Sequence, residues 1–213
     1  MNDVLHALGN GDVFLLTLLD LSAAFDTTDH NVSLQRLEHL YGISDTPLNW
    51  FTSYLSNRTQ IVIINNKLPQ PSMLNFGVPQ GSVLGPILFI QNTKPLTTLN
   101  RQHSISNQSF ADDTQLYNSC RPDQIDDSVQ SMQDCISNVK TWMTANKLKL
   151  IDDKTESLLI ALNRTHFPNP PPISIHIGNT DIPFPPRQKI LVLHFPATCQ
   201  WRSMSLTFAG LLT

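Results

Sequence analysis

The clearest apolar segment lies near the start of the chain, where residues 13–21 read VFLLTLLDL. A nearly continuous apolar run of this length predicts a buried strand. It carries one carboxylate, Asp20, near its end. Because an unpaired buried charge costs several kcal/mol, we expect Asp20 either to meet a cation or to sit at the strand end and cap the next turn.

Two helices are predicted after this strand. Thr28 or Asp29 can cap the first, whose apolar residues fall on one face and which Gly42 ends. The second begins at residues 45–47, with proline in its first turn. Its apolar positions are Trp50, Phe51, Tyr54 and Leu55. We interpret these positions as core packing, and a base-stacking platform is the alternative.

Two hairpins are indicated in the middle of the chain. Residues 59–64 alternate β-branched side chains and lead into an Asn-Asn turn, which predicts one hairpin arm. Residues 109–111 and 116–117 flank a polar Asp-Asp-Thr-Gln tip, which predicts a second hairpin that presents its acids at a turn.

The longest predicted helix follows, because apolar residues recur at every third or fourth position from Ile125 to Met143. Residues 148–151 and 157–161 then resemble two strands joined into a hairpin by a turn at residues 152–155. The order of strand, helices, hairpin, helix and hairpin predicts an α+β fold with an antiparallel sheet faced by helices.

The character of the chain changes beyond about residue 163. More than half of the fifteen prolines lie between Pro168 and Pro196. Proline cannot donate to a strand ladder or continue a helix, so a loop or poorly ordered tail is expected there. We therefore divide the chain into a folded region, residues 1–162, and an irregular proline-rich tail, residues 163–213.

Composition limits the partners that the chain could bind alone. Its 213 residues, 40% of them hydrophobic, can form one medium domain with ample core. The net charge of −3 lacks the basic excess of a free-standing nucleic-acid binder, which counts against a complete polymerase. A local basic stretch consists of Lys140, Lys147, Lys149 and Lys154. A solvated helix face and turn explain that stretch equally well.

Cysteine usage and hydropathy indicate a reduced intracellular protein, nuclear or cytoplasmic, with no membrane partner. Cys120, Cys135 and Cys199 form neither a C-x-x-C pair nor an even set, so no disulfide framework or zinc site is expected. The first residues mix acid, glycine and polar side chains where a secretory signal would be apolar. The longest apolar run is far shorter than the ~20 residues that span a bilayer.

Adjacent carboxylates in the segment Phe110-Ala111-Asp112-Asp113 are the strongest candidate for chemistry. An Asp-Asp pair alone is more typical of a solvated turn. However, if Asp20 and Asp112 met at about 4 Å, their repulsion would be roughly 4 kcal/mol at an effective dielectric of 20. Mg²⁺ removes such repulsion, and two ions about 3.5–4 Å apart can support phosphoryl transfer on nucleotides.

Three motifs together resemble a known family. Residues 19–26 read LDLSAAFD, residues 77–86 read GVPQGSVLGP, and residues 110–113 read FADD. In this order and at these separations, they resemble the reverse transcriptase of LINE-type (non-LTR) retrotransposons. The resemblance covers about residues 13–160, and it implies a polymerase palm with part of the fingers.

The resemblance implies a role for each matching residue. Asp20 and Asp112 match the carboxylates that bridge two Mg²⁺ ions, for which Mn²⁺ can substitute, with Asp113 as a supporting acid and the Leu21 carbonyl as a further ligand. Ala23 and Ala24 match backbone that faces the triphosphate. Phe25 matches the aromatic gate against a 2′-hydroxyl, and a core aromatic is the alternative.

The remaining matches concern the template and the leaving group. Gln80 and Gly81 match a loop that touches nucleotide and template. Lys154, in Lys-Thr-Glu, matches a lysine that protonates pyrophosphate, although a turn lysine alone is usually only solvated. The implied reaction is attack of a DNA primer 3′-hydroxyl on a deoxynucleotide (dNTP), templated by RNA.

The chain also departs from the family. The family's longer fingers region, its thumb and its endonuclease have no counterpart here, and residues 150–152 read Leu-Ile-Asp where members read Leu-Asn-Pro. We therefore expect a truncated palm that retains its acids but cannot clamp a duplex for processive synthesis. The alternatives are a catalytically inactive remnant of a mobile element with at most a binding role, and a metal-dependent nuclease.

Overall fold

A computed structural model describes residues 2–22, 25–61, 63, 65, 70–79, 81–110, 113–162, 174–177, 180–183 and 191–192. The helices are α1 (Asn2–Gly9), α2 (His30–Tyr41), α3 (Asp45–Leu55), α4 (Leu84–Thr93), α5 (Pro95–Gln102) and α6 (Ile125–Ala145), with short 3₁₀ helices η1 (Pro122–Gln124) and η2 (Asp152–Lys154). The strands are β1 (Val13–Leu19), β2 (Leu21–Ser22), β3 (Arg58–Gln60), β4 (Ser72–Leu74), β5 (Ser106–Phe110), β6 (Asp113–Cys120), β7 (Lys149–Leu150), β8 (Glu156–Ala161), β9 (Ser174–Ile177), β10 (Thr180–Pro183) and β11 (Leu191–Val192).

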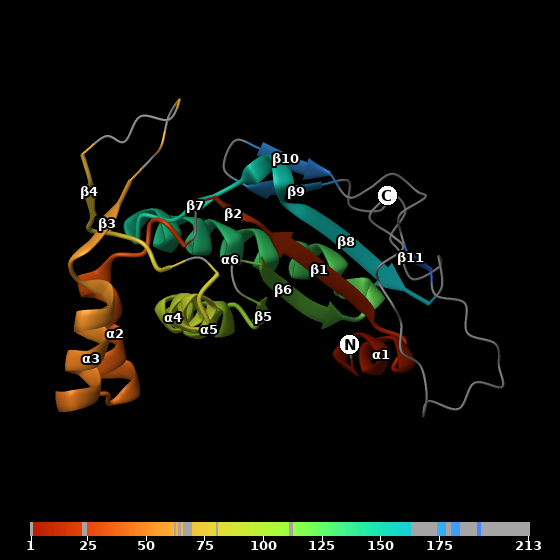
Figure 1. The fold of residues 1–213 in the computed structure, drawn as a ribbon. Coiled ribbons are helices and arrows are strands. Elements are labelled where there is room, and N and C mark those ends of the chain that lie inside the picture. The colour runs from red at the N-terminus through yellow and green to blue at the C-terminus, as the bar shows by residue number, and fades with distance from the viewer. Residues whose placement is uncertain are drawn as a thin grey trace.

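A five-stranded sheet in the order β11-β8-β1-β6-β5 forms the centre of the molecule (Figure 1). The apolar strand predicted from residues 13–21 is its middle strand, β1, which pairs antiparallel with both β6 and β8. Only the short β11 joins in parallel, beside β8. The predicted α+β fold with an antiparallel sheet and helices is confirmed.

The long helix α6 covers one face of this sheet. Met132, Ile136 and Val139 of α6 are buried together with Val13 and Leu15 of β1 in the main hydrophobic cluster. On the opposite face, α1 covers only the start of β1, where Phe14 stacks on Tyr117 of β6 with ring centroids 5.4 Å apart. The far end of that second face carries no described helix.

Helices α2 and α3 lie beside the sheet together with the β3–β4 hairpin (Figure 1). Asp29 caps α2 as predicted, accepting hydrogen bonds from the backbone N–H groups of Asn31 and Val32. Gly42 ends α2 in the left-handed conformation, with φ of 66°. The apolar residues of α3 differ in their environment, because Leu55 is buried whereas Trp50 is 53% exposed and stacks on Tyr54. The core-packing interpretation holds for Leu55 and is wrong for Trp50.

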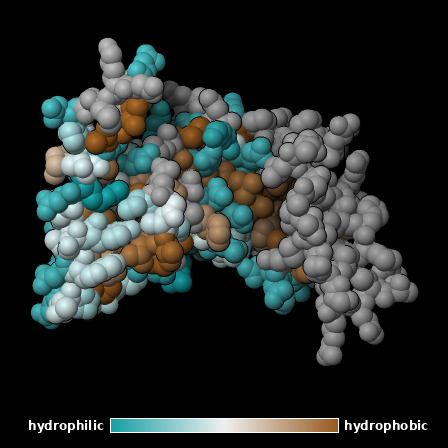
Figure 2. Space-filling view, viewed as in Figure 1, coloured by the Kyte–Doolittle hydropathy of each residue, from teal (hydrophilic) through white to brown (hydrophobic). Residues whose placement is uncertain are grey.

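Apolar side chains also reach the surface in this part of the molecule, as Figure 2 shows over the half that contains α2, α3 and the β3–β4 hairpin. Exposed apolar residues here include Trp50, Ile61 and Met73. The α2–α3 and β3–β4 region therefore carries exposed apolar side chains in addition to its own buried cluster.

The predicted hairpins have mixed outcomes. The arm expected at residues 59–64 is the shorter β3, and it pairs with β4 as a hairpin. The acidic hairpin is also present, but Asp113 already pairs with Phe110, so only residues 111–112 connect β5 to β6. The prediction of a four-residue tip is wrong, because the buried Thr114 is already part of β6 and pairs with Leu19 of β1.

The hairpin expected at residues 148–161 is not formed. β7 pairs with β2, whereas β8 pairs with β1, and η2 lies between them. Both segments therefore pair with the same strand region, residues 13–22, and η2 separates the part that pairs with β1 from the part that pairs with β2. Pairing with that apolar strand buries Leu159 and Ile160, which explains why β8 does not pair with β7.

Part of the proline-rich segment is ordered. β9 and β10 form an antiparallel hairpin in which Ile175 and Ile182 are buried in the main cluster with α6. The expectation of a loop throughout this segment is wrong for these strands, because alternate apolar residues supply a buried face that proline density alone does not reveal. The remaining residues beyond 162, apart from Leu191 and Val192, lie outside the described part of the chain.

Candidate active site

Asp20 and Asp113 lie at the same end of two neighbouring strands. The β1–β6 register pairs Leu19 with Thr114, so the next position along each strand places Asp20 opposite Asp113. Asp20 directly follows β1, and Asp113 is the first residue of β6. The register therefore brings Asp20 and Asp113 to the same end of the sheet, whereas the meeting of Asp20 with Asp112 stays a prediction. Asp112 lies outside the described residues.

Both carboxylates are on the sheet face that α6 leaves uncovered. Leu19 and Leu21 are buried in the α6 cluster, so the intervening Asp20 points to the opposite face. Thr114 is buried and its neighbour Asp113 is exposed, which places Asp113 on that same open face. Phe110, paired with Asp113 across the hairpin, is 80% exposed. The two acids are accessible from solution at a partly apolar surface.

Lys154 provides the nearest described cation to Asp20. Its Nζ lies 3.0 Å from Asp20 Oδ2, and the two side chains are 64% and 32% exposed. The backbone also connects these segments, because the Ile151 N–H donates to the Asp20 carbonyl at 3.0 Å. Lys154, which the resemblance assigns to the leaving group, is thus an ion-pair partner of the first candidate metal ligand.

The basic stretch at residues 140–154 is largely neutralised by carboxylates. Lys140 pairs with Asp152 at 2.6 Å, Lys147 pairs with Asp29 at 3.3 Å, and Lys154 pairs with Asp20. Lys149 is exposed on β7 and has no ion pair among the described residues. The Lys147 and Lys154 side chains are nevertheless 60% and 64% exposed, as the interpretation of a solvated face expects.

Phe25 lies between the main hydrophobic cluster and the cluster formed by α2, α3 and α4. Its ring packs against the main cluster and against the cluster formed by α2, α3 and α4, and its centroid is 5.3 Å from that of Phe89. The Phe25 carbonyl accepts a hydrogen bond from the Val78 N–H at 2.7 Å. Phe25 is thus partly a core aromatic, and its role as a sugar gate stays a prediction. Ala23 and Ala24 lie outside the described residues.

The segment before Gln80 is held tightly against the Phe25 region. A Cβ at Gly77 would lie 3.0 Å from the carbonyl oxygens of both Phe25 and Asp26. The Gly77 carbonyl in turn accepts from His30 Nε2 at 2.7 Å and from Arg58 Nη1 at 3.0 Å. Gly77 is therefore approached closely by the chain's own backbone.

Beyond Gln80, which the structure does not describe, the loop turns into α4. Gly81 has φ of +75° and open space around its Cβ position. Ser82 Oγ donates to the Pro79 carbonyl at 2.7 Å and accepts from the Gly85 N–H at 3.0 Å. A Cβ at Gly85 would lie 2.7 Å from the Pro79 oxygen, so this position requires glycine. Of the three glycines, Gly81 alone has the open surroundings that a ligand could approach.

The Leu21 carbonyl is available to a ligand on geometric grounds. Asp20 and Ile151 form a hydrogen-bonded pair, and in an antiparallel ladder such pairs alternate with non-hydrogen-bonded pairs. Leu21, opposite Leu150, is therefore in a non-hydrogen-bonded position. Its carbonyl points away from β7, toward the side on which β6 lies.

These donors fit divalent cations of the Mg²⁺ type. Asp20, Asp113 and the Leu21 carbonyl are all oxygen ligands, and Asp20 already attracts a cation in the form of Lys154. Within the described ranges, no three His, Cys, Asp or Glu side chains gather into a metal-binding group. The complete set would need Asp112, which those ranges do not include.

No helix in the described part of the chain is long and apolar enough to cross a membrane.

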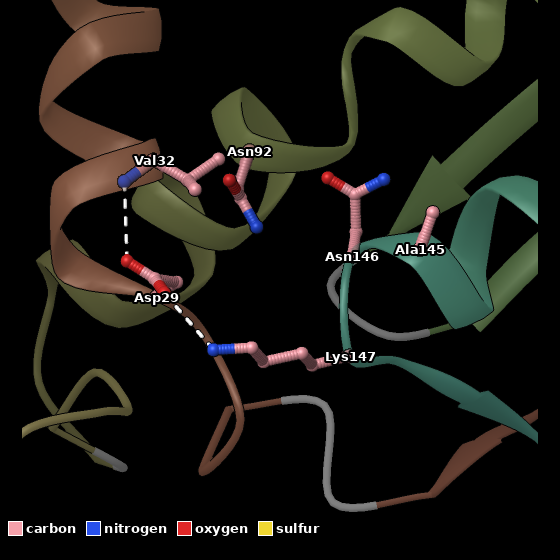
Figure 3. A pocket seen from close by; sticks show the side chains of 6 residues that line it. All are labelled: Asp29, Val32, Asn92, Ala145, Asn146 and Lys147. Atoms are coloured by element: carbon pink, nitrogen blue, oxygen red, sulfur yellow. Dashed lines mark hydrogen bonds and ion pairs between the residues drawn. The ribbon is translucent and has the colours of Figure 1, made fainter.

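A small pocket is lined by residues of α2 and α4, by Asp29 before α2, and by residues at the end of α6 (Figure 3). Asp29 extends from its helix cap toward Lys147, whose ammonium also lies 4.7 Å from the ring centroid of Phe76. Burial raises the pKa of Asp29, but hydrogen bonds from Val32, Lys147 and Asn31 outweigh it, so the pKa lies below its ordinary value. We interpret this pocket as a structural joint because its charged groups are already paired.

The comparison with protein families decides the ancestry of this arrangement. The family described as "Reverse transcriptase (RNA-dependent DNA polymerase)" matches residues 6–197, which is most of the chain. The chain belongs to the reverse transcriptase family. The three motifs noted in the sequence all fall within the matched range.

A curated reverse transcriptase relative comes from a mobile element. The "Probable RNA-directed DNA polymerase from transposon BS" of Drosophila melanogaster is 26% identical over 163 residues. This alignment covers 71% of the chain but only 17% of the relative. The chain therefore corresponds to a small part of that longer protein.

Solved structures with the same fold include telomerases. The apo telomerase of Candida tropicalis, truncated from its C-terminal domain, has a TM-score of 0.58 at 15% identity, covering 85% of this chain and 36% of that one. The C. tropicalis telomerase in complex with a TWJ fragment of telomeric RNA has a TM-score of 0.57 at 15% identity, covering 95% of this chain and 33% of that one. At these identities the likeness establishes the reverse transcriptase fold.

Several supporting residues were not found from the sequence. Lys140 and Asp152 pair across the turn that carries Lys154, and His30 and Arg58 hold the Gly77 carbonyl. None of the four belongs to a recognised motif. The only available signal for Asp152 was its departure from the family's Leu-Asn-Pro sequence.

Proposed function

We propose that residues 1–162 are the palm and partial fingers of a retrotransposon enzyme that extends a DNA primer on an RNA template, using dNTPs. Residues 163–213 are proposed as a proline-rich segment whose described strands β9, β10 and β11 pack against this palm. The observation that carries the proposal is the position of Asp20 and Asp113, opposite each other on neighbouring strand ends and on the open sheet face. Family membership supports it, since both acids lie within the matched range, residues 6–197.

Asp20, Asp112, Asp113 and the Leu21 carbonyl are the groups that would hold two Mg²⁺ ions or, in their place, Mn²⁺. When bound, such ions activate the attacking hydroxyl and stabilise charge on the departing oxygen. The chain supplies the position of these ligands, since β1 and β6 fix Asp20 and Asp113 through a continuous ladder. Fixed ligands need little reorganisation during the reaction, which is the main protein contribution to phosphoryl transfer.

The nucleotide is proposed to lie between the acids and the Phe25 region. The backbone of Ala23 and Ala24 would face the triphosphate, and Phe25 would lie under the sugar. Gln80 and Gly81 would contact the nucleotide and the template, for which the open surroundings of Gly81 leave room. These roles are consistent with the hydrogen bond that holds the loop against the Phe25 carbonyl.

Lys154 is proposed to serve the leaving group. The primer 3′-hydroxyl loses its proton to solvent as its oxygen bonds to the α-phosphorus, and the bond to the pyrophosphate oxygen breaks. The Lys154 ammonium donates a proton to the departing pyrophosphate and regains one from solvent. Its exposed side chain, 3.0 Å from Asp20, is within reach of the same open face. The Lys154 ammonium can move from Asp20 to a phosphate oxygen by a rotation of its flexible side chain alone.

Primer extension on an RNA template tests this function. We expect the full chain with Mg²⁺ or Mn²⁺ to add dNTPs, and Asp20→Asn and Asp113→Asn each to lower the rate by at least about a hundredfold. Asp134→Asn is the matched control, because Asp134 lies on α6 and hydrogen-bonds to Gln130 on an exposed surface. A folded parent chain that makes no product, or a residue 20 variant as active as the parent, would refute the proposal. Template degradation without added nucleotides would indicate a nuclease.

A further inference from the structure

The turn that carries Lys154 is attached to α6 by an ion pair outside the motifs. Lys140 Nζ lies 2.6 Å from Asp152 Oδ2, and the two side chains are only 36% and 26% exposed. The other carboxylate oxygen, Asp152 Oδ1, is buried and has no hydrogen-bond partner among the described residues. Lys140 is therefore the single described cation that faces this carboxylate.

The same turn is short and tightly connected to Asp20. Asp152 begins η2 and Lys154 ends it, so a change in the orientation of Asp152 is transmitted directly to Lys154. Ile151, just before the turn, donates its N–H to the Asp20 carbonyl, and Lys154 contacts the Asp20 carboxylate. The turn is thus anchored to α6 at its start and to Asp20 at its end.

We propose that Lys140 is a positioning residue: by holding Asp152, it orients the η2 turn so that Lys154 stays on Asp20. Without Lys140, the partly buried Asp152 carboxylate loses its partner and moves toward solvent to regain hydration, which displaces the η2 turn that carries Lys154. Lys154 then spends less time at Asp20. The role assigned to this contact in catalysis rests on the proposed function, whereas the contact itself does not.

Chemical acetylation of lysines, followed by peptide mass spectrometry of the full folded chain, tests the contact without any activity. In the parent, Lys154 should react more slowly than Lys149, although both are exposed, because only Lys154 has a carboxylate partner. Lys140→Met should raise the Lys154 rate by about two- to fivefold, the range expected for loss of an exposed ion pair. Asp20→Asn gives the rate of fully released Lys154.

Further variants separate positioning from general loss of structure. Lys140→Arg keeps the charge and should retain the parent rate, and Lys149→Met should leave Lys154 unchanged. Asp152→Asn combined with Lys140→Met should raise the rate no more than Lys140→Met alone, because both act through one pair. Circular dichroism verifies that each variant is folded. Equal acetylation of Lys154 and Lys149 in the parent, or no change in Lys140→Met, would overturn the proposal.

Kinetics then connect the contact to catalysis. In single-nucleotide addition, Lys140→Met should lower kcat with little change in the KM for primer–template, and it should have no further effect when Lys154→Met is already present. Additive effects of the two changes would contradict a role through Lys154. A parent chain that adds no nucleotide but shows the expected acetylation pattern would refute the proposed function and leave the positioning role intact.

Discussion

Replacing Gly77 with alanine tests how the structure joins the Phe25 region to the loop before Gln80. Gly77 has φ of +86°, and a Cβ there would meet the carbonyl oxygens of Phe25 and Asp26 at 3.0 Å. Two penalties are therefore combined at one position. The backbone conformation is unfavourable for any residue with a Cβ, and the new atom pushes against backbone that cannot rotate away.

The magnitude follows from these contacts. An alanine in the left-handed region costs about 1–2 kcal/mol. Displacing the loop also weakens the hydrogen bonds from Gly77 N–H to Thr28 and from Val78 N–H to Phe25, which are 2.8 and 2.7 Å long. At about 1 kcal/mol net for each bond, the expected loss of unfolding free energy is about 3–4 kcal/mol in total.

Gly11→Ala is the matched control. Gly11 has φ of +81°, but nothing lies within 4 Å of its Cβ position. It should therefore lose only the conformational part, about 1–2 kcal/mol. Urea unfolding followed by far-UV circular dichroism gives both values, provided that the slopes of the two transitions agree. Equal losses for Gly77→Ala and Gly11→Ala would show that the close approach to Phe25 and Asp26 contributes nothing.

Three further outcomes are expected. Asp29→Ala should lower the unfolding free energy by about 1 kcal/mol through loss of the α2 cap, whereas Asp29→Asn should lose much less. The folded-state pKa of Asp29 is lowered, so the parent should be more stable than Asp29→Ala above pH 3.8, the ordinary aspartate pKa, and this difference in stability should disappear as pH falls through the lowered pKa. Thermal melts of the two proteins over a pH series test this, and melting temperatures that do not converge at low pH would contradict it. Burial raises the pKa of Cys135 to about 12, so its peptide should stay unalkylated in the folded chain near neutral pH and react after unfolding; rapid native labelling would mean that the α6 core is open. Leu116→Ala, at a fully buried position of β6, should lose about 2–5 kcal/mol in chemical unfolding, whereas Leu40→Ala at an exposed position should lose less than about 0.5 kcal/mol; similar losses at the two positions would refute the assigned core.

Local features of the fold were predictable because local chemistry determines them. The α2 cap at Asp29, the stop at Gly42 and the three- to four-residue apolar spacing of α6 each depend on neighbours within a few residues. The candidate acids were found for a different reason. Asp20 is a charge in an apolar strand, and the order and spacing of the three motifs identify the family without any tertiary contact.

Pairings between distant segments could not be predicted in this way. The apolar pattern of residues 157–161 is the same whether the strand pairs with its neighbour β7 or with β1, which lies far away in sequence. Nor does a proline-rich composition indicate that Ile175 and Ile182 complete the α6 core. Burial favours one arrangement over another only when all the apolar faces are present together.

The sequence by itself determined the family, the α+β class and the identity of the candidate acids, because motif order and local periodicity are properties of the chain alone. Tertiary structure decided which face Asp20 and Asp113 share, which backbone requires glycine at position 77, and which carboxylates neutralise the lysines. These depend on distances between atoms far apart in sequence. An ion pair or a close backbone contact exists only where the fold brings its two sides together.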